Sequence, residues 1–467
     1  MTFIRACLIT AALLATGVAQ AQSAPSSKAE DSSLTWKGIT VYGIVDVGLQ
    51  YDTHSAPFSD YFPPGSASLV QKNDYQSATG ITPSNLSQSR IGISGNEPLF
   101  GDWAGIFRFE TFFNPQSGDI SDACKSLVLN NGKALATQTV GVDSSICGQL
   151  FNGVGVVGLS SPTVGSFTVG RNTTLLADGI GKYDPLAASN AFSLIGFSGT
   201  AAGGGDTEDR RLDNSVKYAA RYGGLHLGVL YQFGNSSGST NTGYQFQLGG
   251  EVGGLSVDAY YFKKYDAVAA ASLSAAQVTT LQTGPCTAAA PTCWPVSNSL
   301  AATISDNETY SLMALYDFGQ ALPLKIMGGY EHIAFDNPTS PINPGALTIG
   351  GYILAFTNNA AFPNEKRLEV YWAGVRWGLT PKVDLLASYY GYHQNSFATG
   401  ASAGCSNTSN GGCSGKESVV SLVFDYKLTK RFDLYAGSMW SGVYNGLANG
   451  YLIRNNTATT VGARFRF

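Results

Sequence analysis

Apolar and polar residues alternate one by one along much of this chain. In the last strand-like segment, Val461, Ala463 and Phe465 share one parity, while Arg464 and Arg466 share the other. Successive side chains of a β-strand point to opposite faces of a sheet. This period of two predicts strands whose faces meet different surroundings, one apolar and the other polar.

The alternating segments follow one order along the chain: a very short turn, a strand of roughly ten residues and a long polar loop. Short turns are predicted near 97–102, 162–165, 222–224, 252–254, 319–322, 379–381 and 428–431. Long connections are predicted at 52–87, 114–149, 173–210, 235–242, 265–305, 336–366, 394–415 and 443–456. With a first strand at 38–51 and a last one at 457–467, the pattern predicts sixteen antiparallel strands.

Short turns at one end of the strands and long loops at the other predict an all-β transmembrane barrel. Loops of this length count against a compact soluble domain, whereas outer-membrane barrels have periplasmic turns and extracellular loops. Unpaired backbone groups are costly in hydrocarbon, so the last strand is expected to pair with the first. Arg464 and Arg466 then face the water-filled lumen, because an Arg facing lipid costs ~2–4 kcal/mol at mid-depth.

The same parity rule sorts the side chains of other strands. On the third strand it places Arg108 and Glu110 inside the barrel, and Phe107 and Phe109 against lipid. Aromatic residues near strand ends are expected to form the two interfacial girdles of the membrane. They are Tyr260, Tyr261, Phe262, Trp372, Trp377, Tyr389, Tyr390 and Tyr392.

The first 21 residues have the features of a secretory signal peptide. Arg5 is followed by an apolar core, and the segment ends in Ala-Gln-Ala at Ala21. A membrane anchor helix is the alternative, but the apolar core is shorter than the ~20 residues of a bilayer span. The domain division predicted is therefore 1–21 signal peptide and 22–467 outer-membrane barrel.

Composition supports a membrane barrel over a nucleic-acid-binding protein. Charged residues make up 13% of the chain, against ~25% in typical soluble domains. No stretch after residue 22 approaches ~18 consecutive apolar residues, so no spanning helix is predicted there. The formal net charge of −4 gives no basic footprint for nucleic acid.

Six cysteines outside the signal region fall in three of the predicted loops. An even number of cysteines in an exported chain favours disulfides, although six allow fifteen connectivities. Metal binding is the weaker alternative, because no CxxC occurs and the four histidines are scattered. No metal or cofactor is predicted. Pairing of near neighbours would join Cys124 with Cys147, Cys286 with Cys293, and Cys405 with Cys413.

Several motifs in this order resemble those of Gram-negative general diffusion porins of the betaproteobacterial type. They are GITVYGIVDVGLQY, SRIGISGNE, GSFTVGRNTT, RLDNSVKYAARYGGLHLGVLYQFG and the terminal Phe467. The resemblance implies a homotrimer in the outer membrane, in contact with lipid and lipopolysaccharide, whose third loop folds into the lumen. It also implies that Phe467 is read by the outer-membrane assembly machinery.

In such porins acidic groups of the third loop face a cluster of arginines on the wall. Arg90, Arg171 and Arg211 match the wall positions, and Glu110 resembles an acidic position near the constriction. The third loop lacks the Pro-Glu-Phe-Gly-Gly stretch of enteric porins, and Asp178 and Asp184 are its first acidic candidates. Parity adds Arg108. The predicted constriction is Arg90, Arg108, Glu110, Arg171, Asp178, Asp184 and Arg211.

Arg171 shares its parity with Phe167 and Val169, so strict alternation would place it in lipid. The cost of such a placement predicts that alternation breaks there, and a β-bulge is the usual device.

The resemblance implies passive diffusion of ions and small hydrophilic solutes, and the arginine cluster favours a weak anion preference. The alternative is a substrate-specific channel for a sugar or organic acid, for which Tyr42 and Trp372 are the aromatic hints. A barrel hydrolase would need a histidine beside a serine, and His332 is the histidine well inside a strand. A soluble propeller or adhesin would not need strict asymmetry between turns and loops.

Overall fold

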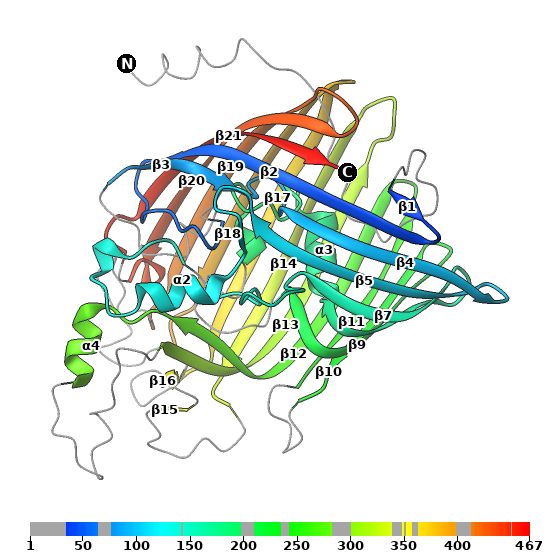
Figure 1. Ribbon diagram of the computed structural model, residues 1–467. Helices are drawn as coiled ribbons and strands as arrows, with labels where there is room; N and C mark the ends of the chain where they lie inside the picture. The colour runs from blue at the N-terminus through cyan, green and yellow to red at the C-terminus, as the bar shows by residue number, and fades with distance from the viewer. Residues whose placement is uncertain are drawn as a thin grey trace.

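The computed structural model describes residues 34–63, 76–141, 143–197, 210–234, 242–282, 300–338, 348–349, 352–356, 363–397, 412–449 and 451–467. Within these ranges sixteen antiparallel strands form a closed barrel, as the sequence predicted (Figure 1). The predicted signal peptide and Cys286, Cys293 and Cys405 lie outside the described residues. None of the described helices has the length and apolarity needed to cross a membrane.

The barrel wall follows the order of the chain, each strand pairing with the next. It consists of β2 (Ile39–Asp52), β3 (Ala78–Pro83) with β4 (Arg90–Phe100), β5 (Trp103–Asn114), β7 (Val154–Ser161), β8 (Gly165–Thr173), β9 (Arg211–Tyr222), β10 (Leu225–Gln232), β11 (Gly243–Val252), β12 (Leu255–Ala271), β13 (Ala301–Asp317), β14 (Leu324–Asp336), β17 (Lys366–Thr380), β18 (Val383–Gln394), β19 (Gly415–Lys427), β20 (Phe432–Asn445) and β21 (Asn455–Arg466).

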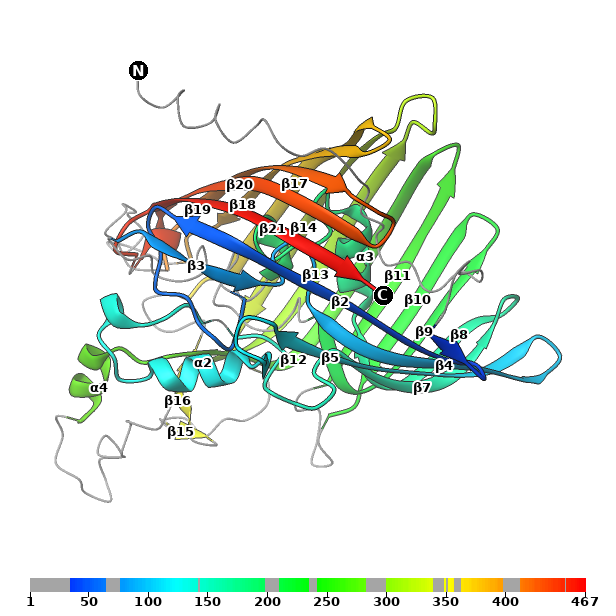
Figure 2. The same ribbon diagram turned by 45° about the horizontal axis from the view of Figure 1, so that its top comes forward.

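Short elements accompany the wall. The strands are β1 (Thr35–Trp36), β6 (Asp119–Ile120), β15 (Thr348–Ile349) and β16 (Tyr352–Phe356). The α-helices are α2 (Ala123–Asn130), α3 (Leu175–Tyr183) and α4 (Ala275–Gln282). Short 3-10 turns lie at Leu135–Thr137, Leu194–Phe197 and Gly446–Ala448. In Figures 1 and 2, α3 lies inside the ring of strands, while α2 and α4 lie at the end that carries the long loops.

The first and last strands pair, which confirms the predicted closure. Their register runs from Ile44 opposite Arg466 to Asp52 opposite Ala458. The two faces of β21 also differ as predicted. Phe465 is 41% exposed on the outer face, whereas Arg464 is 2% exposed on the inner one. The alternation in the sequence therefore does mark the lipid and the lumen faces.

The second strand is interrupted, which the sequence reading missed. Part of the predicted first loop is β3, and the chain leaves the sheet at 84–89 before β4 begins. Asp46 holds this insertion, because its carboxylate accepts the backbone N–H groups of Leu86 at 2.9 Å and Ser87 at 2.7 Å. Ser84 adopts a left-handed backbone with φ of 59°. The strand thus gains a local excursion toward the lumen, directly before Arg90.

The predicted loop 336–366 also contains strand structure. Its segment β16 pairs in parallel with the first residues of β13, from Ala301 opposite Ile353 to Ile304 opposite Phe356. Residues 301–305 of β13 extend beyond β14, whose pairing with β13 begins at Asp306, so one edge of this segment is open to an added strand. Length and polarity alone did not distinguish this segment from an irregular loop.

A large apolar core lies inside the barrel. It joins third-loop residues such as Leu175, Tyr183 and Phe192 to inward-facing residues of the wall such as Met313 and Leu386. These side chains are nearly fully buried, with exposures of 0–2%. Residues 174–197 of the third loop therefore pack against the wall as part of a protein core.

This core corrects the prediction of aromatic girdles. Of the eight aromatic residues assigned there, Trp377 and Tyr389 are exposed on the outer face at 41% and 39%. Five others point inward and are buried, because alternation places adjacent aromatic residues on opposite faces and loop 3 covers the inner ones. They are Tyr260, Phe262, Trp372, Tyr390 and Tyr392.

Candidate pore constriction

The helix of loop 3 is fixed to the wall through one buried carboxylate, that of Asp258 on β12. Lys182 approaches it with Nζ at 3.1 Å, and the hydroxyl of Tyr183 donates to it. His226 Nδ1 lies 3.0 Å from the other oxygen. Burial lowers the pKa of Lys182, and Asp258 opposes that shift. Burial and the bond to Asp258 together raise the pKa of Tyr183.

The turn after α3 is anchored by Asp184, which is fully buried. Its carboxylate accepts the N–H groups of Leu186 and Ala188 and the hydroxyl of Tyr390. The guanidinium of Arg376 donates to the carbonyl of Asp184 at 2.8 Å. Asp184 therefore serves to position the loop, and we do not place it among the groups that face the pore.

The tip of loop 3 reaches the interrupted second strand on the other side of the barrel. Ala191 N–H donates to the carbonyl of Asn85 at 2.9 Å, and Asn190 Nδ2 donates to that of Ser84 at 2.9 Å. Ser421 on β19 donates to the carbonyl of Phe192 at 2.7 Å. Loop 3 consequently runs along the inner wall from β8 to the 84–89 insertion.

The inner faces of β2, β4 and β5 carry a cluster of charges around Glu110. Arg108 Nη2 donates to Glu110 Oε2 at 2.7 Å, and Tyr42 donates to the same oxygen at 3.1 Å. Arg90 Nε lies 3.7 Å from it. Glu110 is 2% exposed, while Arg108 is 37% exposed. Solutes can therefore reach the guanidinium of Arg108, while Glu110 holds the cluster together from behind.

Arg211 on β9 extends this cluster. Its guanidinium lies over the ring of Phe112, 4.4 Å from the centroid, and it interacts electrostatically with Glu110. Among the described residues, three arginines thus lie near one carboxylate, and these four side chains carry a net charge of +2. We call Arg90, Arg108, Glu110 and Arg211 the constriction cluster.

Asp178, on α3, lies on the side of loop 3 that water can reach. Its carboxylate is 50% exposed and forms an ion pair with Lys217 of β9. Lys217 Nζ also donates to the carbonyl of Thr173 at 2.9 Å. The pair is neutral overall, so Asp178 compensates a wall cation instead of opposing the constriction cluster.

Arg171 lies outside the cluster around Glu110. The register of β8 and β9 shifts between Gly170 and Asn172, which confirms the predicted break in alternation. The guanidinium of Arg171 donates to the carbonyl of Asn152 at 2.9 Å and to that of Ser145. It also forms an ion pair with Asp213. Arg171 therefore holds the rim of the barrel to loop 2.

The two arginines of the last strand form buried ion pairs on the inner face. Arg464 Nη2 lies 2.6 Å from Asp433 and 3.1 Å from Asp425. Arg466 Nη1 lies 2.8 Å from Asp433. Arg464 Nη1 also donates to Ser87 in the insertion of the second strand. These contacts join β19, β20 and β21 to the 84–89 segment across the seam.

Sequence reasoning missed three inward-facing residues that fix loop 3, namely Lys217, Asp258 and Arg376. The alternation does indicate that such residues face inward. Asp258, for example, lies between Val257 and Ala259 on β12, whose odd-numbered residues face outward. What alternation lacks is the path of loop 3, which decides whether an inward charge meets water or another side chain.

The aromatic and histidine residues that suggested other functions have structural partners. Trp372 is 3% exposed, and its Nε1 donates to the carbonyl of Tyr183 at 3.1 Å. His332 Nδ1 lies 2.8 Å from Glu369, which also accepts the hydroxyl of Tyr330 on the outer face. No group of three or more metal-ligating side chains was found in the part of the chain that the structure describes.

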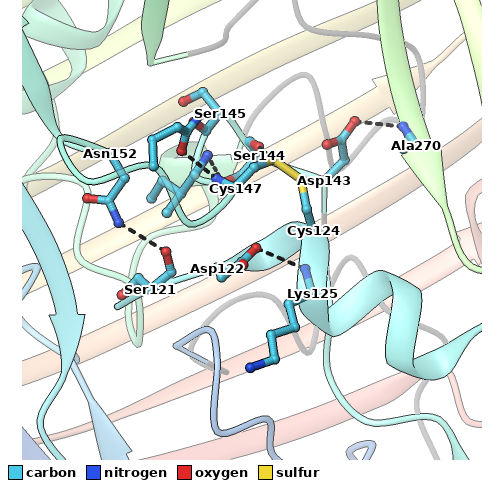
Figure 3. The surroundings of a disulfide bond; sticks show 12 residues. Ser121, Asp122, Cys124, Lys125, Asp143, Ser144, Ser145, Cys147, Asn152 and Ala270 are labelled. Atoms are coloured by element: carbon cyan, nitrogen blue, oxygen red, sulfur yellow. Dashed lines mark hydrogen bonds between the residues drawn. A yellow bond between two sulfur atoms is a disulfide. The ribbon is translucent and has the colours of Figure 1, made fainter. Parts of the chain in front are cut away.

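Loop 2 contains the Cys124–Cys147 disulfide, one of the three predicted pairs (Figure 3). Cys124 lies in α2, whose N-cap Asp122 accepts the N–H of Lys125 at 2.9 Å. Cys413 is buried. Its pairing with Cys405 and the Cys286–Cys293 pair stay predictions.

Comparison with known proteins agrees with this geometry. A family model described as a Gram-negative porin matches residues 8–441. No significant match was found among curated protein sequences.

Two solved structures are similar over nearly the whole chain. The anion-selective porin from Comamonas acidovorans is 17% identical, with 92% of this chain and 99% of that one covered and a TM-score of 0.58. OmpT, an outer membrane protein of Vibrio cholerae, is 14% identical, with 93% and 99% covered and a TM-score of 0.53. A trimer form of OmpT has a TM-score of 0.52, at 14% identity over 92% and 99%. At these identities the likeness concerns the fold.

Proposed function

Because this chain belongs to the family of Gram-negative porins, we propose that its outer-membrane diffusion pore prefers anions and that the constriction cluster sets this preference. The pore carries ions and small hydrophilic solutes, as its family and barrel indicate. A substrate-specific channel for a sugar or organic acid is not favoured, because Trp372, one of its two aromatic hints, is buried behind loop 3. The other hint, Tyr42, belongs to the hydrogen-bond network of Glu110.

The excess of positive charge at the constriction cluster carries the proposal. Selectivity in a narrow pore follows the rings of charge at its narrow part rather than the net charge of the protein. Two unit charges ~8 Å apart interact by ~0.5 kcal/mol in bulk water and several-fold more at the lower effective dielectric of a narrow pore. Three arginines around one carboxylate should therefore attract anions although the whole chain is formally −4.

The acidic side chains in the described part of loop 3, residues 174–197, support the same proposal. Its Asp178 is paired with Lys217, and its Asp184 is buried in the loop anchor. Neither carboxylate balances the arginines. The related porin from Comamonas acidovorans is described as anion-selective, which agrees with this assignment.

The test is the reversal potential of the purified protein in a planar bilayer under a salt gradient. The wild type should show anion preference, and Arg108→Gln should shift the reversal potential toward cations. Arg367→Gln is the matched control, because Arg367 is exposed at 53% and pairs with Glu365 outside the lumen. Cation preference in the wild type, or equal shifts in both variants, would contradict the proposal.

Assembly and surroundings follow from family membership as proposals. We infer a homotrimer with one pore per chain, supported by the trimer form of OmpT among the similar structures. We infer that residues 1–21 direct export and that the assembly machinery reads Phe467. Lipid and lipopolysaccharide would surround the outer face. The protein is a channel rather than an enzyme, and we propose that it has no catalytic activity.

A further inference from the structure

A cavity of about 160 Å³ lies beside the constriction, at the end of the barrel that carries the long loops. Residues 145–149 of loop 2 form one side of it. The other sides are the loop ends of β8 and β9, together with Gln232 of β10 and Lys264 of β12. Parity places Gln232 and Lys264 on the inner face of the wall. A solute entering from outside meets this cavity before the constriction cluster.

The lining of the cavity is rich in positive charge. Among the described residues that line it are Arg171, Arg211 and Lys264, together with one carboxylate, that of Asp213. Asp213 forms an ion pair with Arg171. The guanidinium of Arg211 lies over the ring of Phe112, and the ammonium of Lys264 donates to Gln232. These four described side chains carry a net charge of +2 and present both planar guanidinium and ammonium donors.

The loop 2 wall of the cavity is fixed by covalent and hydrogen bonds (Figure 3). The disulfide joins Cys147 to Cys124 of α2. Asp143 accepts the N–H of Ala270, beyond Lys264 on β12, at 2.6 Å. The carbonyl of Ser145 accepts from Arg171. Residues 143–149 are therefore held to α2, to β12 and to β8. Because this wall is already in place, binding costs less conformational entropy.

We propose that this cavity binds a small oxyanion, a phosphate or carboxylate group, on its way from the extracellular side to the constriction. Guanidinium groups can donate two hydrogen bonds to a planar carboxylate or a tetrahedral phosphate, and a lysine supplies a point charge. A drug-sized ligand needs roughly 300–1,000 Å³, so the cavity accommodates one small oxyanion. The inference deepens the proposed anion preference and rests on it, but it assigns a second site, which shares Arg211 with the constriction cluster and adds Arg171 and Lys264.

Lys264 offers a sharp test because its chain neighbour is a matched control. Lys263 lies one residue away on the outer face, paired with Glu308 at 3.1 Å. Chloride current through single channels would be recorded while inorganic phosphate, or acetate in a separate series, is added on the loop side. The wild type should show saturable block, and Lys264→Gln should raise the half-blocking concentration roughly tenfold, as expected for losing a charge-assisted hydrogen bond. Lys263→Gln should leave it unchanged.

The Cys124–Cys147 disulfide provides a second, independent test of the proposed oxyanion site. Replacing Cys124 and Cys147 together by Ser, or reducing the wild type, should raise the phosphate concentration needed for half block. Reductant should have no further effect on the double variant. Stronger block by phosphate than by acetate would assign a multiply charged oxyanion, and equal block would assign a carboxylate-type site.

Outcomes separate this site from the proposed selectivity. The site is refuted if phosphate blocks the Lys264→Gln and Lys263→Gln variants at the same half-blocking concentration, or if phosphate block of the wild type does not saturate. Either result refutes it whatever the reversal potential shows. If the wild type shows no anion preference but phosphate block saturates and depends on Lys264, the site stands and the selectivity proposal fails. Circular dichroism and heat-modifiable gel migration of each variant confirm that the barrel is folded.

Discussion

Gly43 of β2 and Phe467, the last residue of this chain, exchange two backbone hydrogen bonds. Gly43 N–H donates at 3.0 Å and Phe467 N–H at 3.1 Å. The aromatic ring of Phe467 lies over Gly43, so that a Cβ added there would come within 2.3 Å of the ring. The ring also stacks on Phe465 with centroids 6.2 Å apart. The seam of the barrel therefore ends in an aromatic pair that needs a glycine opposite it.

Replacement of Gly43 by Val should weaken closure of the barrel. The new side chain must displace the ring of Phe467, and overpacking of this kind costs ~1–3 kcal/mol. We expect a lower urea midpoint of unfolding, measured by tryptophan fluorescence in detergent, and less heat-modifiable folded protein. Gly105→Val is the control, because its nearest neighbour atoms lie 3.7 Å or more from an added Cβ. Equal midpoints for the two variants would contradict the role of this contact.

Arg464→Ala should destabilise the barrel more strongly. The side chain of Arg464 is 2% exposed between Asp425 and Asp433, which are themselves nearly fully buried. Removing one partner of a buried ion pair leaves an uncompensated charge and costs ~3–5 kcal/mol. The exposed pair of Arg367 and Glu365 provides the comparison, because such pairs contribute ~0–1 kcal/mol. Urea unfolding should therefore separate Arg464→Ala from Arg367→Ala, and similar midpoints would argue against the buried network.

The alternation of apolar and polar residues could predict the strands of the barrel wall, because each strand has one face toward lipid and the other toward the lumen. Phe465 and Arg464 occupy the faces expected of them, and the bulge near Arg171 follows from the cost of placing a charge in lipid. The Cys124–Cys147 pair followed from its position in one loop. These features depend on local spacing, which the sequence contains.

The candidate site could be predicted only in part, because parity says that a side chain faces inward but not what it meets there. Loop 3 covers one part of the inner wall, so Trp372 and Asp184 are buried although they belong to a channel lumen. Arg171 folds over the rim to loop 2. The partners of these side chains are distant in sequence. Trp372, for example, donates to the carbonyl of Tyr183, and Arg376 donates to that of Asp184.

Asp258→Asn should loosen loop 3 without unfolding the barrel. The variant loses charge-assisted bonds to Lys182 and Tyr183, which contribute about 1.5–3 kcal/mol each. The apolar packing of α3 remains and keeps the loop inside. We expect larger open-channel noise and a higher single-channel conductance. Asp317→Asn is the control, since Asp317 is 36% exposed and its ion pair is with Lys325 of β14. Unchanged noise in Asp258→Asn would show that the Asp258 carboxylate does not fix the loop.

Ion selectivity should change with pH through Lys182. Burial lowers the pKa of this lysine, while the carboxylate of Asp258, 3.1 Å away, opposes the shift. As pH rises, Lys182 therefore loses its proton at a lower pH than an ordinary lysine, whose pKa is ~10.4. Its positive charge then disappears while Asp258 stays ionised. The lumen becomes more negative, and anion preference should decrease before the exposed lysines titrate.

The measurement is the reversal potential between roughly pH 8 and pH 10, below the ordinary lysine pKa. The wild type should shift toward cations over this range. Lys182→Met should already be shifted toward cations at pH 7 and should lack the step, because its side chain carries no proton to lose. Lys382→Met, in the exposed turn between β17 and β18, should keep the wild-type step. If the profiles of the wild type and Lys182→Met run parallel, the charge that titrates in the pore belongs to another group.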